Sequence, residues 1–484
     1  MHSGTPAEGE GAAASEGQTA GGDEGARPPG PSGLPVLGNL RELARDRPTF
    51  LEATAREYGD VVRYRFGPTT EMYGLFHPDH IRRVLVAERD TYAKGAFFRS
   101  RMAFLGDSVL TSEGEKWREQ RGVIEPIFHP DRMAGYVDDM ATAAEELTDE
   151  WADGEVRDVY DDHIGLALDI VAGALFDVDI SDAQDDIGGP LDTVMAHFRK
   201  KSRRPVDLPD WVPTPANLRY RRAKANLHDT VADIVEDLQE DGPNGRPGDD
   251  LQDGAFARLA AGFADEEGGS THELRSQVTT LLIAGHETTA QAMTYACHLL
   301  ATHPAVQERL VAEVRDVVGK GPVTAADLED LAYTEQVVRE AMRLYPPVPS
   351  FPRETVEPDV VGGYRIPAGA TVWVSPWVVQ RDERSWEAPE RFDPGRWGDE
   401  RGSDGGGEGD GECNNDRHPF SYVPFGGGPR RCLGDRFAMT EAKTVLATIY
   451  RDYHLEPVAG ADLELAPAIT LRPAGGLDLE VRAR

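Results

Sequence analysis

The sequence predicts a mainly α-helical fold with a minor β portion. Helical periodicity of the apolar residues extends over four segments, whereas the runs rich in β-branched residues are short. The four segments are 131–150, 272–302, 304–318 and 327–345, and the clearest strand is "ATVWVS", from Ala370 to Ser375. The length of 484 residues suggests roughly three domains of about 150 residues each, or one large helical enzyme fold.

The net charge of −34, from 51 basic and 85 acidic residues, restricts the partners and the surroundings. So acidic a chain repels phosphate, which disfavours nucleic acid as a partner. Repulsion between the carboxylates is screened at about 1 M salt, where the Debye length is roughly 3 Å. We therefore expect a high-salt cytoplasm, with an ordinary acidic protein as the alternative. The three cysteines indicate a reducing interior and no disulfide framework.

Two low-complexity segments flank or interrupt the folded part. Residues 1–27 contain almost no apolar side chain and are expected to be a disordered tail. Residues 398–417 are expected to be an acidic, glycine-rich surface insertion that carries Cys413 as a bystander. Neither a signal peptide nor an apolar stretch of about 18 residues is present, so we expect a soluble protein without a transmembrane segment.

The segment "VPFGGGPRRCLGDRFA", Val423 to Ala438, places Cys432 behind glycines and before a helical pattern. A thiolate near a helix N-terminus is stabilised by the macrodipole and by free N–H groups, which makes it a good ligand or nucleophile. The cysteine could be structural, a nucleophile with a histidine base, or a metal ligand. A zinc site with Cys413 and His418 has a spacing that fits no usual ligand pair.

Five residues of this segment form a more specific pattern, F-x-x-G-x-R-x-C-x-G. They are Phe425, Gly428, Arg430, Cys432 and Gly434. The pattern resembles the haem-binding loop of the cytochrome P-450 superfamily. The resemblance spans residues 28–484 and implies the cytochrome P-450 fold, haem b as cofactor and Cys432 as the thiolate ligand of its iron.

The segment "AGHETT" supports the same resemblance. Gly285, Glu287 and Thr288 match the oxygen-activating helix of the family. Reduction of oxygen needs protons in a dry pocket, and an acid beside an alcohol can relay them from water, so Glu287 and Thr288 are the expected catalytic residues. Gly285 is expected to leave room for oxygen beside the helix.

Other motifs of the family imply supporting roles. By resemblance, Trp117, Arg121, Arg353 and Arg430 hold the haem propionates, a task suited to the planar guanidinium fork. In the same way, Glu340 and Arg343 of "EAMR" and Arg391 of "PERF" are expected to form a buried ion network that supports the pocket.

The resemblance therefore implies a haem-thiolate monooxygenase of the soluble prokaryotic type, which the charge assigns to the cytoplasm of a halophilic archaeon. Its partners would be O2, a hydrophobic substrate and a separate electron donor, namely a ferredoxin with its reductase. We expect Arg431, Arg436 and Lys116 to dock the ferredoxin, and residues 96–110 and 194–198 to line the substrate pocket. The alternatives are a peroxide-driven peroxygenase, a non-oxidative isomerase and a haem-based sensor.

Overall fold

The computed structural model describes residues 25–67, 70–176, 178, 184–202, 210–240, 255–263, 272–398, 417–461, 463–467 and 469–484. Most of the predicted tail and insertion, including Cys413, therefore lies outside the described residues. The last part of the predicted tail is ordered, because Ala26 N donates a hydrogen bond to Gly363 O at 3.2 Å and Ala26 O accepts one from Arg365 N. The ordered chain thus includes residues 25–27, which the sequence assigned to the tail.

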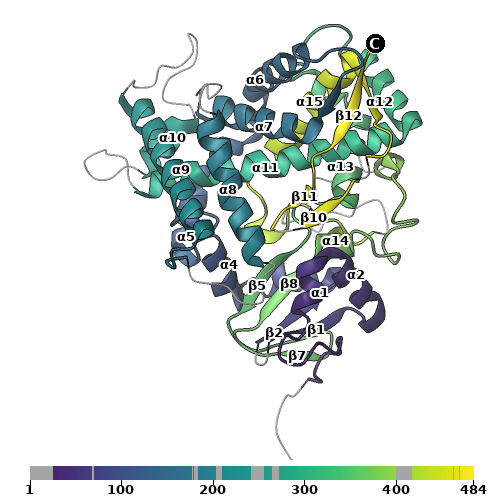
Figure 1. Cartoon of the computed structure of the whole chain (residues 1–484). Helices are drawn as coiled ribbons and strands as arrows, with labels where there is room; N and C mark the ends of the chain where they lie inside the picture. The colour runs from purple at the N-terminus through teal and green to yellow at the C-terminus, as the bar shows by residue number, and fades with distance from the viewer. Residues whose placement is uncertain are drawn as a thin grey trace, which may run out of the picture.

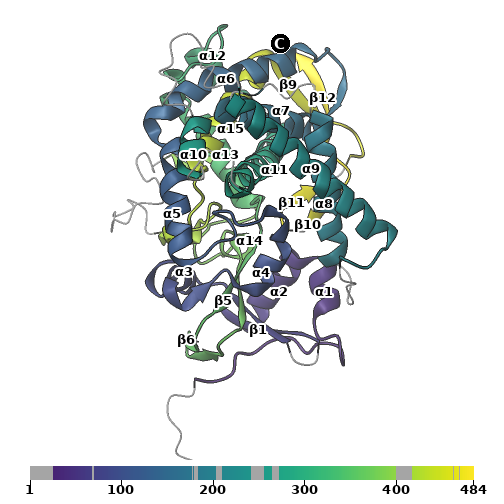
Figure 2. The same ribbon diagram turned by 90° about the vertical axis from the view of Figure 1, so that its left-hand side faces the viewer.

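Most of the chain is helical, as predicted, and the long helices surround α11 (Figures 1 and 2). The helical part comprises α5 (Gly114–Ile124), α6 (Pro130–Asp149), α7 (Val159–Phe176), α8 (Gln184–Ser202), α9 (Pro215–Glu240), α10 (Ala255–Phe263), α11 (His272–Thr302), α12 (Pro304–Val317), α13 (Ala332–Leu344) and α15 (Asp435–Asp452). Most positions of α11 are buried, which is typical of a helix at the centre of a large domain.

A smaller region holds the main sheet at the lower end of the molecule in Figure 1. It contains α1 (Leu40–Arg45), α2 (Arg47–Tyr58), α3 (Pro78–Arg82), α4 (Gly95–Arg101), α14 (Pro376–Val379), β1 (Val61–Phe66), β2 (Thr70–Leu75), β3 (Tyr92–Ala93), β5 (Phe351–Thr355) and β8 (Thr371–Val374). The strand order is β1-β2-β8-β5-β3, with β2 and β8 parallel and the other pairs antiparallel.

Within the described parts of the chain there are three further, smaller sheets. Their strands are β4 (Val156–Asp158), β9 (Tyr453–Pro457) and β12 (Asp478–Ala483) in the order β4-β12-β9, and the pairs β6 (Asp359–Val361) with β7 (Tyr364–Ile366) and β10 (Leu465–Pro467) with β11 (Leu471–Pro473). The hairpin β10–β11 lies directly beside α11 in Figures 1 and 2.

Four predicted elements are confirmed as α6, α11, α12 and β8, with small shifts at their ends. The segment 327–345 differs, because a short 3₁₀ turn at Asp327–Glu329 is separated from α13. The start of α13 is fixed by Glu313 of α12, whose carboxylate accepts the N–H groups of Tyr333 at 2.6 Å and Thr334 at 2.8 Å. A cap supplied by another helix cannot be read from local periodicity.

The largest apolar core forms around α11 and includes Val278 and Met293 of α11 and Val445 and Leu446 of α15. Within the part of the chain that the structure describes, no helix is both long and apolar enough to span a membrane.

Candidate active site

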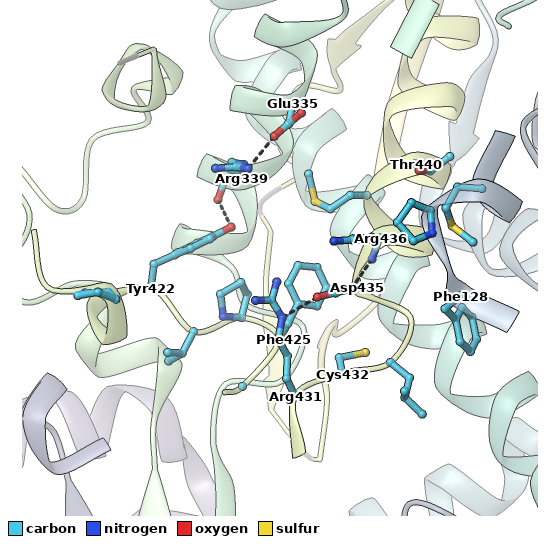
Figure 3. Close-up of a pocket in the computed structure, with 18 of the residues that line it drawn as sticks. Phe128, Glu335, Arg339, Tyr422, Phe425, Arg431, Cys432, Asp435, Arg436 and Thr440 are labelled. Carbon is cyan, nitrogen blue, oxygen red and sulfur yellow. Dashed lines mark hydrogen bonds and ion pairs between the residues drawn. The ribbon is translucent and has the colours of Figure 1, made fainter. Parts of the chain in front are cut away.

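The loop before α15 is held in one shape by its glycines and its backbone hydrogen bonds. Gly426 and Gly428 have φ of 73° and 64°, which glycine adopts most easily. An added Cβ at Gly428 would also clash with the backbone carbonyl of Leu85. Cys432 N donates to Phe425 O at 3.0 Å, so Phe425 fixes the backbone of the cysteine three residues before α15 starts (Figure 3).

The Cys432 side chain is exposed to a cavity of about 910 Å³. Enclosure by the protein, followed by the nearby Asp435 carboxylate, raises the pKa of the Cys432 thiol to about 11. This result corrects the expectation that the helix N-terminus alone favours the thiolate. A metal cation bound to the sulfur would displace the proton, as thiolate ligation requires.

Arg430 lies against Trp117, so two of the residues expected to hold the haem propionates are in contact. Its guanidinium carbon is 3.9 Å from the centre of a Trp117 ring, and its Nη1 donates to Ser112 O at 3.0 Å. The guanidinium also forms an ion pair with Glu113, which sequence reasoning did not identify. Glu113 accepts the backbone N–H of Lys94 at 2.6 Å, so this carboxylate joins the start of α4 to the cysteine loop.

Arg353 and Lys94 add two more cations to the Arg430 site. Burial and the neighbouring Arg430 lower the pKa of Arg353 to about 10, and among the described residues Arg353 forms no ion pair with a carboxylate. Burial, Arg430 and Arg353 lower the pKa of Lys94 well below its usual range. Only Arg430 of these three residues pairs with Glu113, and Arg353 and Lys94 lie within electrostatic reach of Arg430. Two largely buried arginines beside one carboxylate fit an anionic group such as the propionates of haem.

Arg121 is placed differently from the expectation. Its Nη1 donates to Arg431 O at 3.1 Å and its Nη2 to Glu125 at 3.1 Å. The side chain is within electrostatic reach of Lys94 and Arg430, but its hydrogen bonds brace the cysteine loop from α5.

One face of α11 is open within an otherwise buried helix. Ala284 is exposed and Thr288, one turn later, is partly exposed. Thr288 Oγ1 donates to Ala284 O at 2.6 Å. The exposed Ala284 and the partly exposed Thr288 leave this face of α11 open to a bound group.

Glu287 lies on another face of α11. Its Oε1 accepts hydrogen bonds from Arg472 Nε at 3.1 Å, Arg472 Nη2 at 2.5 Å, Thr470 Oγ1 at 3.0 Å and Gln291 Nε2 at 3.2 Å. Among the described residues, no hydrogen bond joins Glu287 to Thr288. The structure therefore does not bring the expected acid and alcohol into contact.

Gly285 has a packing role in place of the expected room for oxygen. An added Cβ would lie 2.7 Å from Val171 Cγ2 of α7. The glycine thus allows α7 to approach α11 closely.

The buried ion network contains a different arginine from the one expected. Arg343 forms two hydrogen bonds of 2.9 Å with Glu340, and both side chains are fully buried. The second cation on Glu340 is Arg396, at 2.8 Å, and Trp397 Nε1 donates to Glu340 at 3.0 Å.

Arg391 contributes only its carbonyl oxygen, which accepts from Arg343 Nη2 at 3.2 Å. Its side chain is 63% exposed and pairs with Asp393. The "PERF" arginine is therefore not an ion partner of Glu340, because the chain turns it toward solvent and brings Arg396 inward.

The cavity at Cys432 has a mixed charged and apolar lining (Figure 3). Arg431 and Arg436 line it, together with Glu335 and Asp435. Its lining includes no residue of α11, of residues 96–110 or of residues 194–198. Lys116 is also absent from the lining and pairs with Asp107 at 3.1 Å.

The histidine of the zinc alternative is committed to other contacts. His418 Nδ1 accepts the N–H of Phe420 at 3.1 Å, and its Nε2 lies 3.1 Å from Asp79. No cluster of three or more His, Cys, Asp or Glu residues that could hold a metal occurs among the described residues.

Comparison with known proteins identifies the family. The family model of cytochrome P450 matches residues 28–476. The chain is 35% identical over 446 residues to cyclooctatin synthase of Streptomyces melanosporofaciens, covering 91% of this chain and 92% of the relative. It is 33% identical to cyclooctat-9-en-7-ol 5-monooxygenase of the same organism, covering 90% of each chain, and 32% identical to pentalenene oxygenase of Streptomyces avermitilis, covering 94% and 97%.

A solved structure shares the fold. The retinoic acid bound cyanobacterial CYP120A1 superposes with a TM-score of 0.80 at 25% identity, over 95% of this chain and 100% of that chain. The motif match, the fold and these relatives agree, and the chain belongs to the cytochrome P450 family, whose members are haem b oxidoreductases.

Proposed function

We propose that this chain is a monooxygenase that inserts one atom of O2 into a hydrophobic substrate. The balanced reaction is RH + O2 + 2 e⁻ + 2 H⁺ → ROH + H2O, with the electrons from a separate protein. The observation that carries the proposal is the Thr288 hydroxyl on the open face of α11, in a chain whose Cys432 thiol is exposed to the cavity described above. Product formation that depends on both O2 and an electron donor tests it.

In the proposed site, Cys432 supplies the iron ligand, and Phe425, Gly428 and Gly434 shape its loop. Trp117, Arg353 and Arg430, joined by Lys94, hold the propionates. When bound, the haem supplies the activation of oxygen. The Thr288 hydroxyl, bonded to Ala284 O, is held on the open face, where it can pass a proton inward.

A peroxygenase or an isomerase remains the alternative, since neither reaction requires an acid and an alcohol on α11. A peroxygenase forms product with hydrogen peroxide and no electron donor, and an isomerase forms product without O2. A haem-based sensor forms no product at all. Turnover assays that omit each component in turn separate these functions.

We propose a terpene-like substrate. Support comes from the names of the bacterial relatives, which specify pentalenene and cyclooctat-9-en-7-ol, and from the retinoic acid bound to the solved structure. All three compounds consist mainly of hydrocarbon. Titrating the haem-loaded protein with a library of such compounds, and recording shifts of its Soret band, tests this proposal. Binding confined to small polar compounds contradicts it.

For the electron donor we propose an acidic ferredoxin that docks at the Cys432 cavity. Arg436 is exposed there and Arg431 is beside it, paired with Asp435 at 2.6 Å. Lys116 has less support, because it does not line the cavity. Arg436→Glu is expected to slow reduction by ferredoxin at least threefold and to leave reduction by dithionite unchanged.

The charge of −34 further supports a protein of a high-salt cytoplasm. The relatives named above come from Streptomyces and give no support to an archaeal origin.

A further inference from the structure

Three histidines cap the start of a helical segment in the same way. His77, His129 and His418 each precede a proline and stand at the N-cap of α3, of α6 and of the 3₁₀ turn Pro419–Ser421. In each case the Nδ1 atom accepts the backbone N–H two residues later, at 3.2, 3.5 and 3.1 Å. An imidazole that accepts at Nδ1 is neutral and has its proton on Nε2. Protonation of the ring therefore removes each of these caps.

His418 differs from the other two histidines in what surrounds its Nδ1. His77 and His129 are each followed by Pro-Asp, and the aspartate carboxylate lies 3.5 and 3.3 Å from the same Nδ1. A proton on that atom can therefore exchange the cap for an ion pair. His418 is followed by Pro-Phe, and its carboxylate partner, Asp79 of α3, lies 3.1 Å from Nε2. A proton on Nδ1 of His418 would face the Phe420 N–H, and no ion pair among the described residues compensates the lost bond at this atom.

The turn that His418 caps supports the cysteine loop. Ser421 donates to His418 O from its N–H at 2.9 Å and from its hydroxyl at 2.7 Å. With the bond from Phe420, three hydrogen bonds hold the turn. The Phe420 ring packs against Gly427 of the cysteine loop, where an added Cβ would lie 2.7 Å from Phe420 Cε1. A shift of the turn therefore moves a ring that is in direct contact with the loop.

Charges on α3 act on the His418 ring. Burial has the largest effect and lowers the pKa of His418, Asp79 opposes it, and His77 and Arg82 lower the pKa further. Since the net direction is downward from the ordinary value of about 6.5, the ring is neutral at pH 7 and its cap is complete. Below pH 6.5 the released ring binds a proton more readily than the capped ring, so acid favours release.

We propose that His418 is a positioning residue for the haem-binding loop: its neutral ring holds the turn Pro419–Ser421 against the loop, and protonation of the ring releases both. This inference rests on the proposed role of Cys432 as the iron ligand. Haem retention should then decrease in mild acid. At pH 5.5, one unit below 6.5, protonation favours the released loop by at most about tenfold.

The test measures how fast the haem-loaded protein transfers its haem to an excess of apomyoglobin at pH 7.5 and at pH 5.5. For the wild type we expect a three- to tenfold faster transfer at the lower pH. His418→Asn keeps a side-chain acceptor at the N-cap that does not titrate in this range. Its transfer rates at the two pH values should therefore agree within about twofold.

His129→Asn is the matched control. His129 also caps a helix before a proline and also lines the Cys432 cavity, but its Nδ1 has the Asp131 carboxylate nearby. This variant should keep the pH dependence of the wild type. Acid unfolding of the whole protein affects the wild type and both variants alike, so the comparison isolates the His418 ring.

Hydrogen exchange of the wild type gives a second measurement that needs no variant. After division by the intrinsic exchange rate at each pH, the backbone of residues 418–427 should exchange at least threefold faster at pH 5.5 than at pH 7.5. Residues 332–344, in α13, should show no such change. If His418→Asn fails to bind haem, this measurement decides the question.

Equal pH dependence of haem transfer in the wild type and in His418→Asn overturns the proposal, as does a flat profile in His129→Asn or unchanged exchange of residues 418–427. The iron ligand is tested separately. A red-shifted carbonyl band that survives in Cys432→Ser counts against the proposed ligand and not against the pH-sensitive contact of His418 with the turn.

Discussion

Single residues decide the chemistry of the site, and Cys432 is the first to test. Cys432→Ser should abolish the strongly red-shifted Soret band of the reduced, carbon monoxide-treated protein, because that band reports a thiolate opposite the carbon monoxide. Cys413→Ser should keep the band, since that cysteine lies in the low-complexity insertion. A red-shifted band in the Cys432 variant would rule out this ligand.

The Thr288 hydroxyl is expected to control how electrons are used. Thr288→Ala should bind haem and substrate normally but divert more than half of the electrons to hydrogen peroxide. The reason is that the open face of α11 then lacks the hydroxyl bonded to Ala284. The ratio of product to NADPH consumed measures the effect, and Thr302→Ala, at an exposed hydroxyl near the end of α11, is the control. Equal ratios in the wild type and the Thr288 variant would exclude the relay.

His163 makes the folded protein sensitive to acid. It is fully buried in α7, its Nδ1 is 3.0 Å from Thr294 Oγ1, and its Nε2 has no hydrogen-bond partner among the described residues. Burial lowers the pKa of His163 to about 3. Below pH 6.5 the histidine is protonated in the unfolded chain but stays neutral in the folded protein. The free energy of unfolding therefore decreases as the pH is lowered below 6.5, by up to about 1.4 kcal/mol per pH unit.

His163→Gln removes this acid-sensitive contribution. Between pH 6 and pH 5 the wild type should lose about 1 kcal/mol more of its unfolding free energy than the variant. Urea denaturation at both pH values measures the difference. Parallel losses in the two proteins would show that His163 is protonated in the folded state.

Site residues that belong to a short sequence motif could be predicted from the sequence. Cys432 with Phe425, Gly428 and Arg430 follows a fixed spacing, and the structure places Arg430 against Trp117, another residue that a motif singled out. Partners from distant segments could not be predicted. Lys94 and Glu113 have no motif, although a lysine is rare in this chain. Arg396 takes the place expected for Arg391 because the 3₁₀ turn Pro394–Trp397 directs the Arg396 guanidinium, and not that of Arg391, toward Glu340.

At the scale of elements, the conformation of the cysteine loop depends on the close contact of Gly428 with the backbone of Leu85. Gly428→Ala should destabilise the protein by at least about 2 kcal/mol and reduce the haem content of the purified protein, because the new Cβ meets the Leu85 carbonyl. Gly426→Ala is the matched control: φ is similar, but no atom lies within 4 Å of the added Cβ.

That control should cost only about 1 kcal/mol and keep the haem. Denaturant titration and the ratio of Soret to protein absorbance compare the two variants. Equal haem content in both variants would mean that the contact with Leu85 does not hold the loop in its haem-binding conformation.

Element boundaries show the same limit of local reasoning. The periodicity of α11 and α6 was sufficient to locate both helices. The break before α13 depends on Glu313, which lies 20 residues earlier in the chain than Tyr333. The hairpin that binds Glu287 is short, and its three-residue strands carry too little pattern to be recognised.

At the scale of the whole molecule, the charge of −34 predicts stabilisation by salt. Raising NaCl from 0.1 M to 1 M shortens the Debye length from about 10 Å to about 3 Å and screens most of the repulsion among surface carboxylates. The midpoint of thermal unfolding should rise by several degrees over this range. A midpoint that does not change with NaCl would favour an ordinary acidic protein.

The bond between Glu287 and Arg472 joins positions 185 residues apart. At about 5 to 20 residues per second, a ribosome needs roughly 10 to 40 seconds to add that length of chain. During this interval the acid of α11 has already been made and its cation has not. The nascent protein must therefore tolerate an unpaired carboxylate on its central helix, and the contacts that orient this acid are among the last to be completed during synthesis.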